Sequence, residues 1–73
     1  MEFTFNDHVN VRAGPSTQTQ KVEQYHPGER VRLDQYRISS DGEAWGSYIA
    51  KSGKRRYVCL GKDGESYGSF NKK

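Results

Sequence analysis

The chain has 73 residues, a hydrophobic fraction of 32% and a formal net charge of +3, so it can form one small domain with a thin core. No apolar run approaches the ~18 residues that cross a bilayer, and the first residues, MEFTFNDH, lack the basic-then-apolar order of a signal peptide. Aromatic residues make up 12% of the chain and recur at strand-like intervals, which argues against disorder. We therefore expect one folded, soluble domain over residues 1–73, without an export signal.

Turn residues recur at short intervals along the chain, and no stretch has a helical period. The strands that we expect, in chain order, cover residues 3–5, 9–12, 21–25, 29–38, 43–50, 55–60 and 67–70. In the strand over 29–38, Val31 and Leu33 share one face, and Arg32, Asp34 and Tyr36 share the other. Residues 71–73 are expected to form a frayed tail. The pattern predicts an all-β fold, a small barrel of about six short antiparallel strands.

The sequence offers no recognisable catalytic set. Cys59 has no second cysteine for an internal disulfide and no CxxC or His–Cys cluster for zinc, so we interpret it as a small buried apolar residue. A catalytic thiol would need His8 or His26, and both look like turn residues. Paired carboxylates, HExxH and Ser-His-Asp patterns are absent, and GKDGES lacks the ending of a phosphate-binding loop. We expect a binding domain without catalytic activity, metal or cofactor.

Three segments follow one another along most of the chain: NVRAGPS, then HPGERVRL, then the hairpin AWGSYIAKSGKRRYV. This order resembles the bacterial SH3 (SH3b) domains that anchor peptidoglycan hydrolases to cell walls. The W-x-x-Y pattern, SGKRRYV and the late YGSF resemble the lysostaphin and phage endolysin branch. The resemblance covers residues 9–70 and implies an SH3-like barrel whose ligand is the stem peptide or cross-bridge of Gram-positive peptidoglycan.

The resemblance also implies a setting for the domain. We expect it to serve a phage endolysin, an amidase or endopeptidase, that is made in the host cytoplasm and acts at the bacterial cell wall. Its partners would be the catalytic domain of the same endolysin and, if the chain is a separately translated subunit, further copies in a homo-oligomer. No membrane contact is expected. Relatives use an N-terminal extension as part of their groove, whereas residues 1–8 here are an N-terminal strand or a remnant, so we expect part of that site to be missing or replaced.

Strand alternation selects the first candidate ligand-binding residues. Val58 and Leu60 are the better core residues of their strand, which turns Tyr57 outward. The resemblance places Tyr57 and Trp45 along the groove, where flat aromatic rings provide contact area for a peptide. Two alternatives stay open, namely that Trp45 is the largest core residue of the domain and that Tyr48 belongs to the core.

Four further residues complete the candidate set. Asn10 and Arg12 lie on the strand face opposite Val9 and Val11, where an amide and a guanidinium can meet a peptide carbonyl or carboxylate. The alternative is a solvated strand face. The resemblance places Gln35 and Tyr36 at the border of the ligand.

A basic cluster at the hairpin suggests a second function class. Lys51, Lys54, Arg55 and Arg56 lie beside aromatic residues, as in small barrels that bind single-stranded nucleic acid. Nine acidic residues are spread along the chain, and the same positive charge suits an anionic cell wall or a solvated hairpin tip. We expect wall binding and not nucleic-acid binding, because a basic patch is generic and NVRAGPS is not.

Overall fold

Short antiparallel strands joined by tight turns make up the domain. The computed structural model describes residues 1–71. Its strands are β1 (Glu2–Phe5), β2 (Val9–Arg12), β3 (Lys21–Tyr25), β4 (Arg30–Arg32), β5 (Gln35–Ile38), β6 (Glu43–Ile49), β7 (Arg55–Lys62), β8 (Glu65–Ser66) and β9 (Gly68–Phe70). Within these described residues no helix is long and apolar enough to cross a membrane. The all-β prediction is confirmed, with more strands among the described residues than expected.

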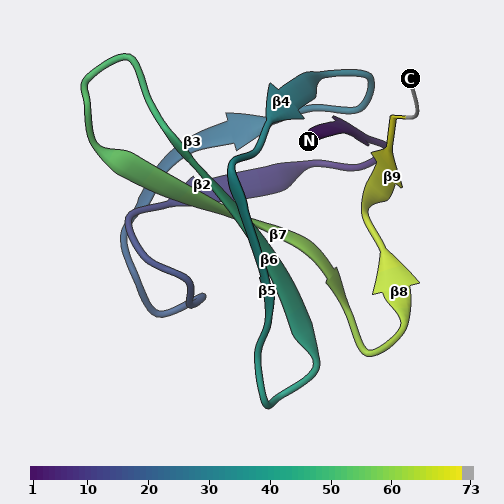
Figure 1. Ribbon diagram of the computed structural model, residues 1–73. Helices are drawn as coiled ribbons and strands as arrows, with labels where there is room; N and C mark the ends of the chain where they lie inside the picture. Colours follow the sequence, from purple (N-terminus) through teal and green to yellow (C-terminus); the bar gives the residue numbers. More distant parts are fainter. Residues whose placement is uncertain (72–73) are drawn as a thin grey trace.

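The strands form two sheets (Figure 1). One sheet has the order β4-β1-β9, and the other has the order β3-β2-β7-β6-β5 with β8 paired to β7. Residues 1–8 contain β1, which pairs with both β4 and β9 at the centre of the smaller sheet. The N-terminal segment is therefore an integral strand of the fold.

Alternating apolar side chains from both sheets build the core. Phe3 and Phe5 of β1 are each 1% exposed, and Val58 of β7 is fully buried. The complete core cluster is Phe3, Phe5, Val9, Val11, Val31, Leu33, Val58 and Leu60. The predicted inward positions of Val31, Leu33, Val58 and Leu60 are confirmed. Tyr48, which the sequence left open as a core residue, is partly buried and packs against this cluster.

The single strand expected over residues 29–38 was wrong. The chain turns a corner at Leu33 and Asp34, so β4 pairs with β1 in one sheet while β5 pairs with β6 in the other. The Leu33 amide donates to the Met1 carbonyl at 2.6 Å, and the next amide, of Asp34, donates to the Ser47 carbonyl at 3.0 Å. Leu33 is buried, whereas Gln35, two residues later, is exposed and pairs with Ser47. The single alternating face predicted over residues 29–38 therefore ends at this corner.

The C-terminal prediction needs two corrections. β8 was not expected, and Asn71 does not fray, because its amide donates to the Glu2 carbonyl at 2.8 Å. Its side-chain oxygen also accepts a hydrogen bond from the Thr4 hydroxyl at 2.9 Å. Residues 72 and 73 of the predicted tail lie outside the described residues.

Gly68 provides a test of how β9 closes the smaller sheet. A Cβ at this position would collide with the Thr4 carbonyl oxygen and lie 2.6 Å from Cε2 of Phe3. We expect Gly68→Ala to lower the free energy of unfolding by about 1–3 kcal/mol, the usual cost of overpacking, in a urea titration. The exposed neighbour Ser69 is the control, and Ser69→Ala should change stability by about 0.5 kcal/mol or less. Equal stability of the two variants would contradict the placement of β9 against β1.

Candidate ligand-binding groove

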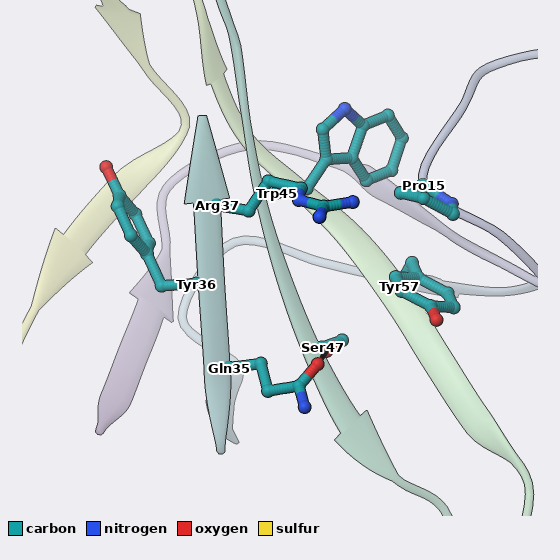
Figure 2. Close-up of a pocket in the computed structure, with 7 residues that line it drawn as sticks. All are labelled: Pro15, Gln35, Tyr36, Arg37, Trp45, Ser47 and Tyr57. Carbon is teal, nitrogen blue, oxygen red and sulfur yellow. Dashed lines mark hydrogen bonds between the residues drawn. The ribbon is translucent and has the colours of Figure 1, made fainter. Parts of the chain in front are cut away.

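An open groove of about 360 Å³ lies on the face of the larger sheet that points away from the core (Figure 2). Strands β5, β6 and β7 supply most of its lining, and the loop after β2 supplies the rest. The lining residues are Pro15, Gln35, Tyr36, Arg37, Trp45, Ser47 and Tyr57.

Strand register arranges the groove residues in two rows across the sheet. Ser47 of β6 pairs with Gln35 on one side and with Tyr57 on the other. Trp45 pairs with Arg37 on one side and with Cys59 on the other, just before a β-bulge between Trp45 and Ala44. Directly paired residues point to the same face of a sheet. The predicted outward position of Tyr57 is therefore confirmed, because its neighbour Val58 pairs with Gly46 and faces the core.

The sequence left open whether Trp45 lines the groove or belongs to the core, and the structure shows features of both. Its side chain is only 2% exposed, yet it lies outside the core cluster and lines the groove. The indole N–H donates to Oε1 of the buried Glu43 at 3.4 Å. Figure 2 shows the indole at the same end of the groove as Arg37 and Pro15. Trp45 thus forms the floor of the groove, and the hydrogen bond from its indole N–H to Glu43 holds the ring in place.

A chain of polar contacts holds the other row in place. Arg55 makes a bidentate contact with Asp34, with nitrogen–oxygen distances of 2.6 and 3.4 Å. The same guanidinium donates to the Ser47 hydroxyl at 3.0 Å, and that hydroxyl donates to Oε1 of Gln35 at 3.4 Å. Hydrogen bonding to Asp34 raises the pKa of Arg55. Because the Gln35 oxygen accepts within this network, its NH₂ group is the part offered to a ligand carbonyl.

The loop after β2 brings Pro15 to the groove. The Thr19 hydroxyl bonds with the carbonyls of Gly14 at 2.9 Å and Ser16 at 2.6 Å. Arg12 donates to the Thr19 carbonyl at 2.9 Å, which ties the loop to β2. These contacts keep the proline on the groove side of the sheet, where it adds apolar surface.

The structure brings together four of the six predicted site residues. Gln35, Tyr36, Trp45 and Tyr57 line the groove. Tyr36 only borders it, because its ring points away from the other lining side chains (Figure 2) and contacts Phe70 edge-on at 5.7 Å between centroids.

Asn10 and Arg12 do not line the groove but a neighbouring hollow of about 410 Å³, although Arg12 is the cross-strand partner of Tyr57. Asn10 accepts a hydrogen bond from Gln24 at 3.2 Å, and the Arg12 guanidinium holds the Thr19 loop. Both side chains therefore have structural contacts, and their role in ligand binding stays a prediction.

Sequence reasoning missed three lining residues: Pro15, Arg37 and Ser47. Arg37 stands two positions from Gln35 and so lies on the same face of the strand. The spacing alone could therefore have predicted it. Ser47 stands two positions from Trp45 and so shares its face by the same spacing. Pro15 lies in a loop whose path no local pattern predicts.

Cys59, which we expected to be a small buried apolar residue, is half-buried and pairs with Trp45 on the outer face of β7. Its thiol donates to the Gly61 carbonyl at 3.3 Å. Burial raises its pKa, which favours the unreactive protonated thiol.

The basic hairpin is less of a cationic patch than the sequence suggests. Lys51 and Lys54 are exposed at the turn. Arg55 is paired with Asp34, and Arg56 lies half-buried opposite Tyr48. The positive charge of Arg55 is therefore neutralised within the fold, and Lys51 and Lys54 are the exposed cations at the hairpin turn.

Comparison with known proteins identifies the family of this chain. The family model described as the bacterial SH3 domain matches residues 1–60. A comparison with curated proteins finds no significant match. Among solved structures, Ly7917 is 39% identical with a TM-score of 0.80, over 93% of this chain and 30% of its own.

Two further structures have the same fold. The cell wall targeting domain of the peptidylglycan hydrolase ALE-1 is 26% identical with a TM-score of 0.80, over 96% of this chain and 78% of its own. The antimicrobial peptidase lysostaphin from Staphylococcus simulans is 22% identical with a TM-score of 0.81, over 96% of this chain and 31% of its own.

This chain therefore spans about a third of the length of Ly7917 and of lysostaphin. The SH3-like fold and the resemblance carried by NVRAGPS and the aromatic hairpin are confirmed. The chain belongs to the bacterial SH3 domain family.

Proposed function

We propose that this domain binds peptidoglycan peptide in the groove between β5, β7 and the Pro15 loop, and that it targets an attached hydrolase to the cell wall. The observation that carries the proposal is the groove itself, where Trp45, Tyr57 and Pro15 stand beside the polar groups of Gln35 and Arg37. A related structure, the cell wall targeting domain of ALE-1, supports the same use for this fold.

The groove chemistry suits a short peptide of small residues. The ring of Tyr57 offers flat apolar contact to alanine side chains or glycine backbone at little cost in conformational entropy. Trp45, which is 2% exposed, lies beneath this surface and adds only a small area to it. Gln35 can donate to a peptide carbonyl. Arg37 can pair with a carboxylate, which stem peptides carry at free or branched positions. The Asp34–Arg55–Ser47 contacts fix this surface before a ligand arrives, which reduces the cost of ordering it.

The mechanism that we propose is tethering without catalysis. A weak site linked to a catalytic domain raises the local concentration of the enzyme, and repeated sites on a polymer raise avidity without new contacts. The parent would be a phage endolysin with amidase or endopeptidase activity, made in the host cytoplasm and acting on a Gram-positive wall. The similarity to Ly7917 covers 30% of that chain, so the parent activity belongs to this proposal. Further copies of the domain in a homo-oligomer would add avidity.

The first prediction concerns binding without cleavage. The tagged 73-residue chain should sediment with purified Gram-positive peptidoglycan and release no soluble fragments. Pulldown with walls from several genera, followed by assay of the supernatant for released amino groups and reducing sugars, measures both properties. Release of fragments would refute the non-catalytic assignment, and absence of retention on every wall type would refute wall binding.

Two neighbouring residues on opposite faces give a matched pair of variants. Tyr57→Ala should reduce wall binding at least tenfold and leave the thermal melt nearly unchanged, because its ring is half-buried at the groove and outside the core. Val58→Ala should cost about 2 kcal/mol of unfolding free energy, because it creates a cavity in a thin core, and its folded fraction should bind normally. A Tyr57→Ala variant that binds like the parent would move the site elsewhere, with the hollow beside Asn10 and Arg12 as the next candidate.

Salt dependence separates wall binding from nucleic-acid binding. Binding to single-stranded DNA through Lys51, Lys54 and Arg56 would weaken steeply between 50 and 200 mM salt, in the way that counterion release predicts. Binding through the groove should change only about twofold over the same range, because most of its contact is apolar or neutral. Retention on walls that vanishes with salt, together with tight binding to single-stranded DNA, would favour the electrostatic alternative.

A further inference from the structure

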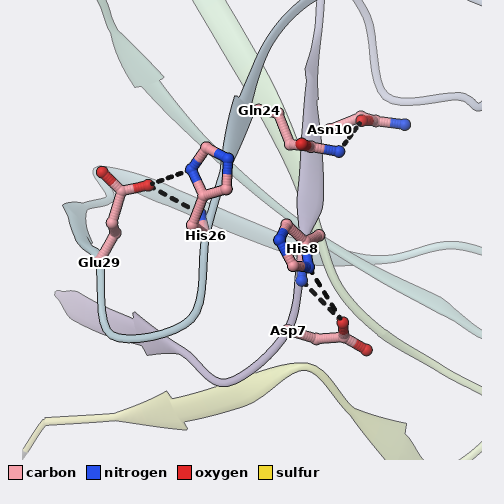
Figure 3. A network of polar contacts seen from close by, with 6 residues as sticks. All are labelled: Asp7, His8, Asn10, Gln24, His26 and Glu29. Carbon is pink, nitrogen blue, oxygen red and sulfur yellow. Dashed lines mark hydrogen bonds and ion pairs between the residues drawn. The ribbon is translucent and has the colours of Figure 1, made fainter.

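The two histidines of the chain meet at one end of the β2–β3 pair, away from the groove. The antiparallel register that pairs Val9 with Tyr25 makes His8 and His26 the next cross-strand neighbours. Their ring centroids are 5.1 Å apart and their planes cross at 84° (Figure 3). Their side chains are 56% and 57% exposed, so an ion can reach both rings from solvent.

A carboxylate stands beside Nδ1 of each ring. His26 Nδ1 lies 3.1 Å from Oε1 of Glu29, which also accepts the His26 backbone N–H at 2.7 Å. His8 Nδ1 lies 3.9 Å from Oδ1 of Asp7. A carboxylate at Nδ1 favours the tautomer with its proton there, which leaves the Nε2 lone pair for another partner. In Figure 3 the second ring nitrogens of His8 and His26 lie on the sides that face each other.

We propose that His8 and His26 form a surface site for a late first-row divalent metal ion such as Zn²⁺, bound through the two Nε2 atoms with water in the remaining positions. Imidazole is a common ligand of these ions. A ligating histidine usually donates its other N–H to a carboxylate, which is the arrangement of His26 with Glu29.

The side chains around His8 and His26 determine how many protein ligands the metal ion could have. Among residues 1–71, no group of three or more His, Cys, Asp and Glu side chains is placed to hold a metal ion. The site is therefore open and two-coordinate from the protein, unlike the closed four-ligand sites of structural zinc. It shares no residue with the groove.

Metal binding would also act on the fold. His8 belongs to the segment between β1 and β2, and His26 to the segment between β3 and β4. An ion held by both would join two turns that are distant in the sequence. Because the unfolded chain does not hold the two rings together, the ion would bind the folded state and raise the melting temperature.

The test uses the full chain with ZnCl₂ at pH 7.5, followed by calorimetric titration and thermal melts. We expect one Zn²⁺ per chain and a melting temperature that rises with Zn²⁺ concentration. His8→Asn and His26→Asn should each weaken binding at least tenfold, and Glu29→Gln should weaken it about tenfold through loss of the charged partner of His26. Amide spectra of the metal-free variants verify that each is folded.

Cys59→Ser provides the control, because the only thiol of the chain lines the same hollow as His8. This variant should bind Zn²⁺ as the parent does. Loss of binding in Cys59→Ser with retention in His26→Asn would overturn the proposal in favour of a thiol–imidazole site. A melting temperature that does not respond to Zn²⁺, or binding that survives both histidine substitutions, would overturn it as well.

Discussion

The antiparallel pairing of β6 with β7 decides which side chains reach the ligand-binding groove and which reach the core. Ser47 pairs with Tyr57, and the next pair along, Gly46 with Val58, points to the other side of the sheet. A slip of one residue would bury Tyr57 and expose Val58. In a domain this small, one pair of strands therefore supplies part of the core and three of the groove residues, Trp45, Ser47 and Tyr57, and the two functions cannot be changed independently.

Polar contacts then hold the groove side chains in the positions that the strand register gives them. The corner between β4 and β5 places Asp34 within 2.6 Å of Arg55, and that guanidinium reaches Ser47 and, through it, Gln35. Arg55, which the sequence suggested as part of a basic surface, therefore orders the groove residues Ser47 and Gln35. With a thin core, such contacts matter because they order the site without requiring more buried apolar area.

Local patterns predicted much of this structure. β2 and β3 have the predicted bounds, since VNVR and KVEQY are flanked by clear turn residues, and the faces of Tyr57 and Val58 followed from alternation alone. Other features depend on contacts between distant segments. At the corner after Leu33 the chain passes from one sheet to the other, and the alternation of buried and exposed residues ends there. The adjacent polar residues Asp34 and Gln35 are its only local sign, and we interpreted them as part of one strand. Whether Tyr36 or Arg37 faces the groove depends on which strand β5 joins, and the meeting of His8 with His26 depends on the β2–β3 register.

The central claim is that a peptide of the cell wall lies along Trp45 and Tyr57. A titration of the ¹⁵N-labelled domain with soluble muropeptides, followed by two-dimensional NMR, tests it most directly. We expect the signals of the Trp45 indole N–H and of the amides of Gln35, Arg37, Ser47 and Tyr57 to shift together with one dissociation constant. Shifts confined to the hollow around Asn10, Arg12 and Thr17, with the indole signal unmoved, would contradict it.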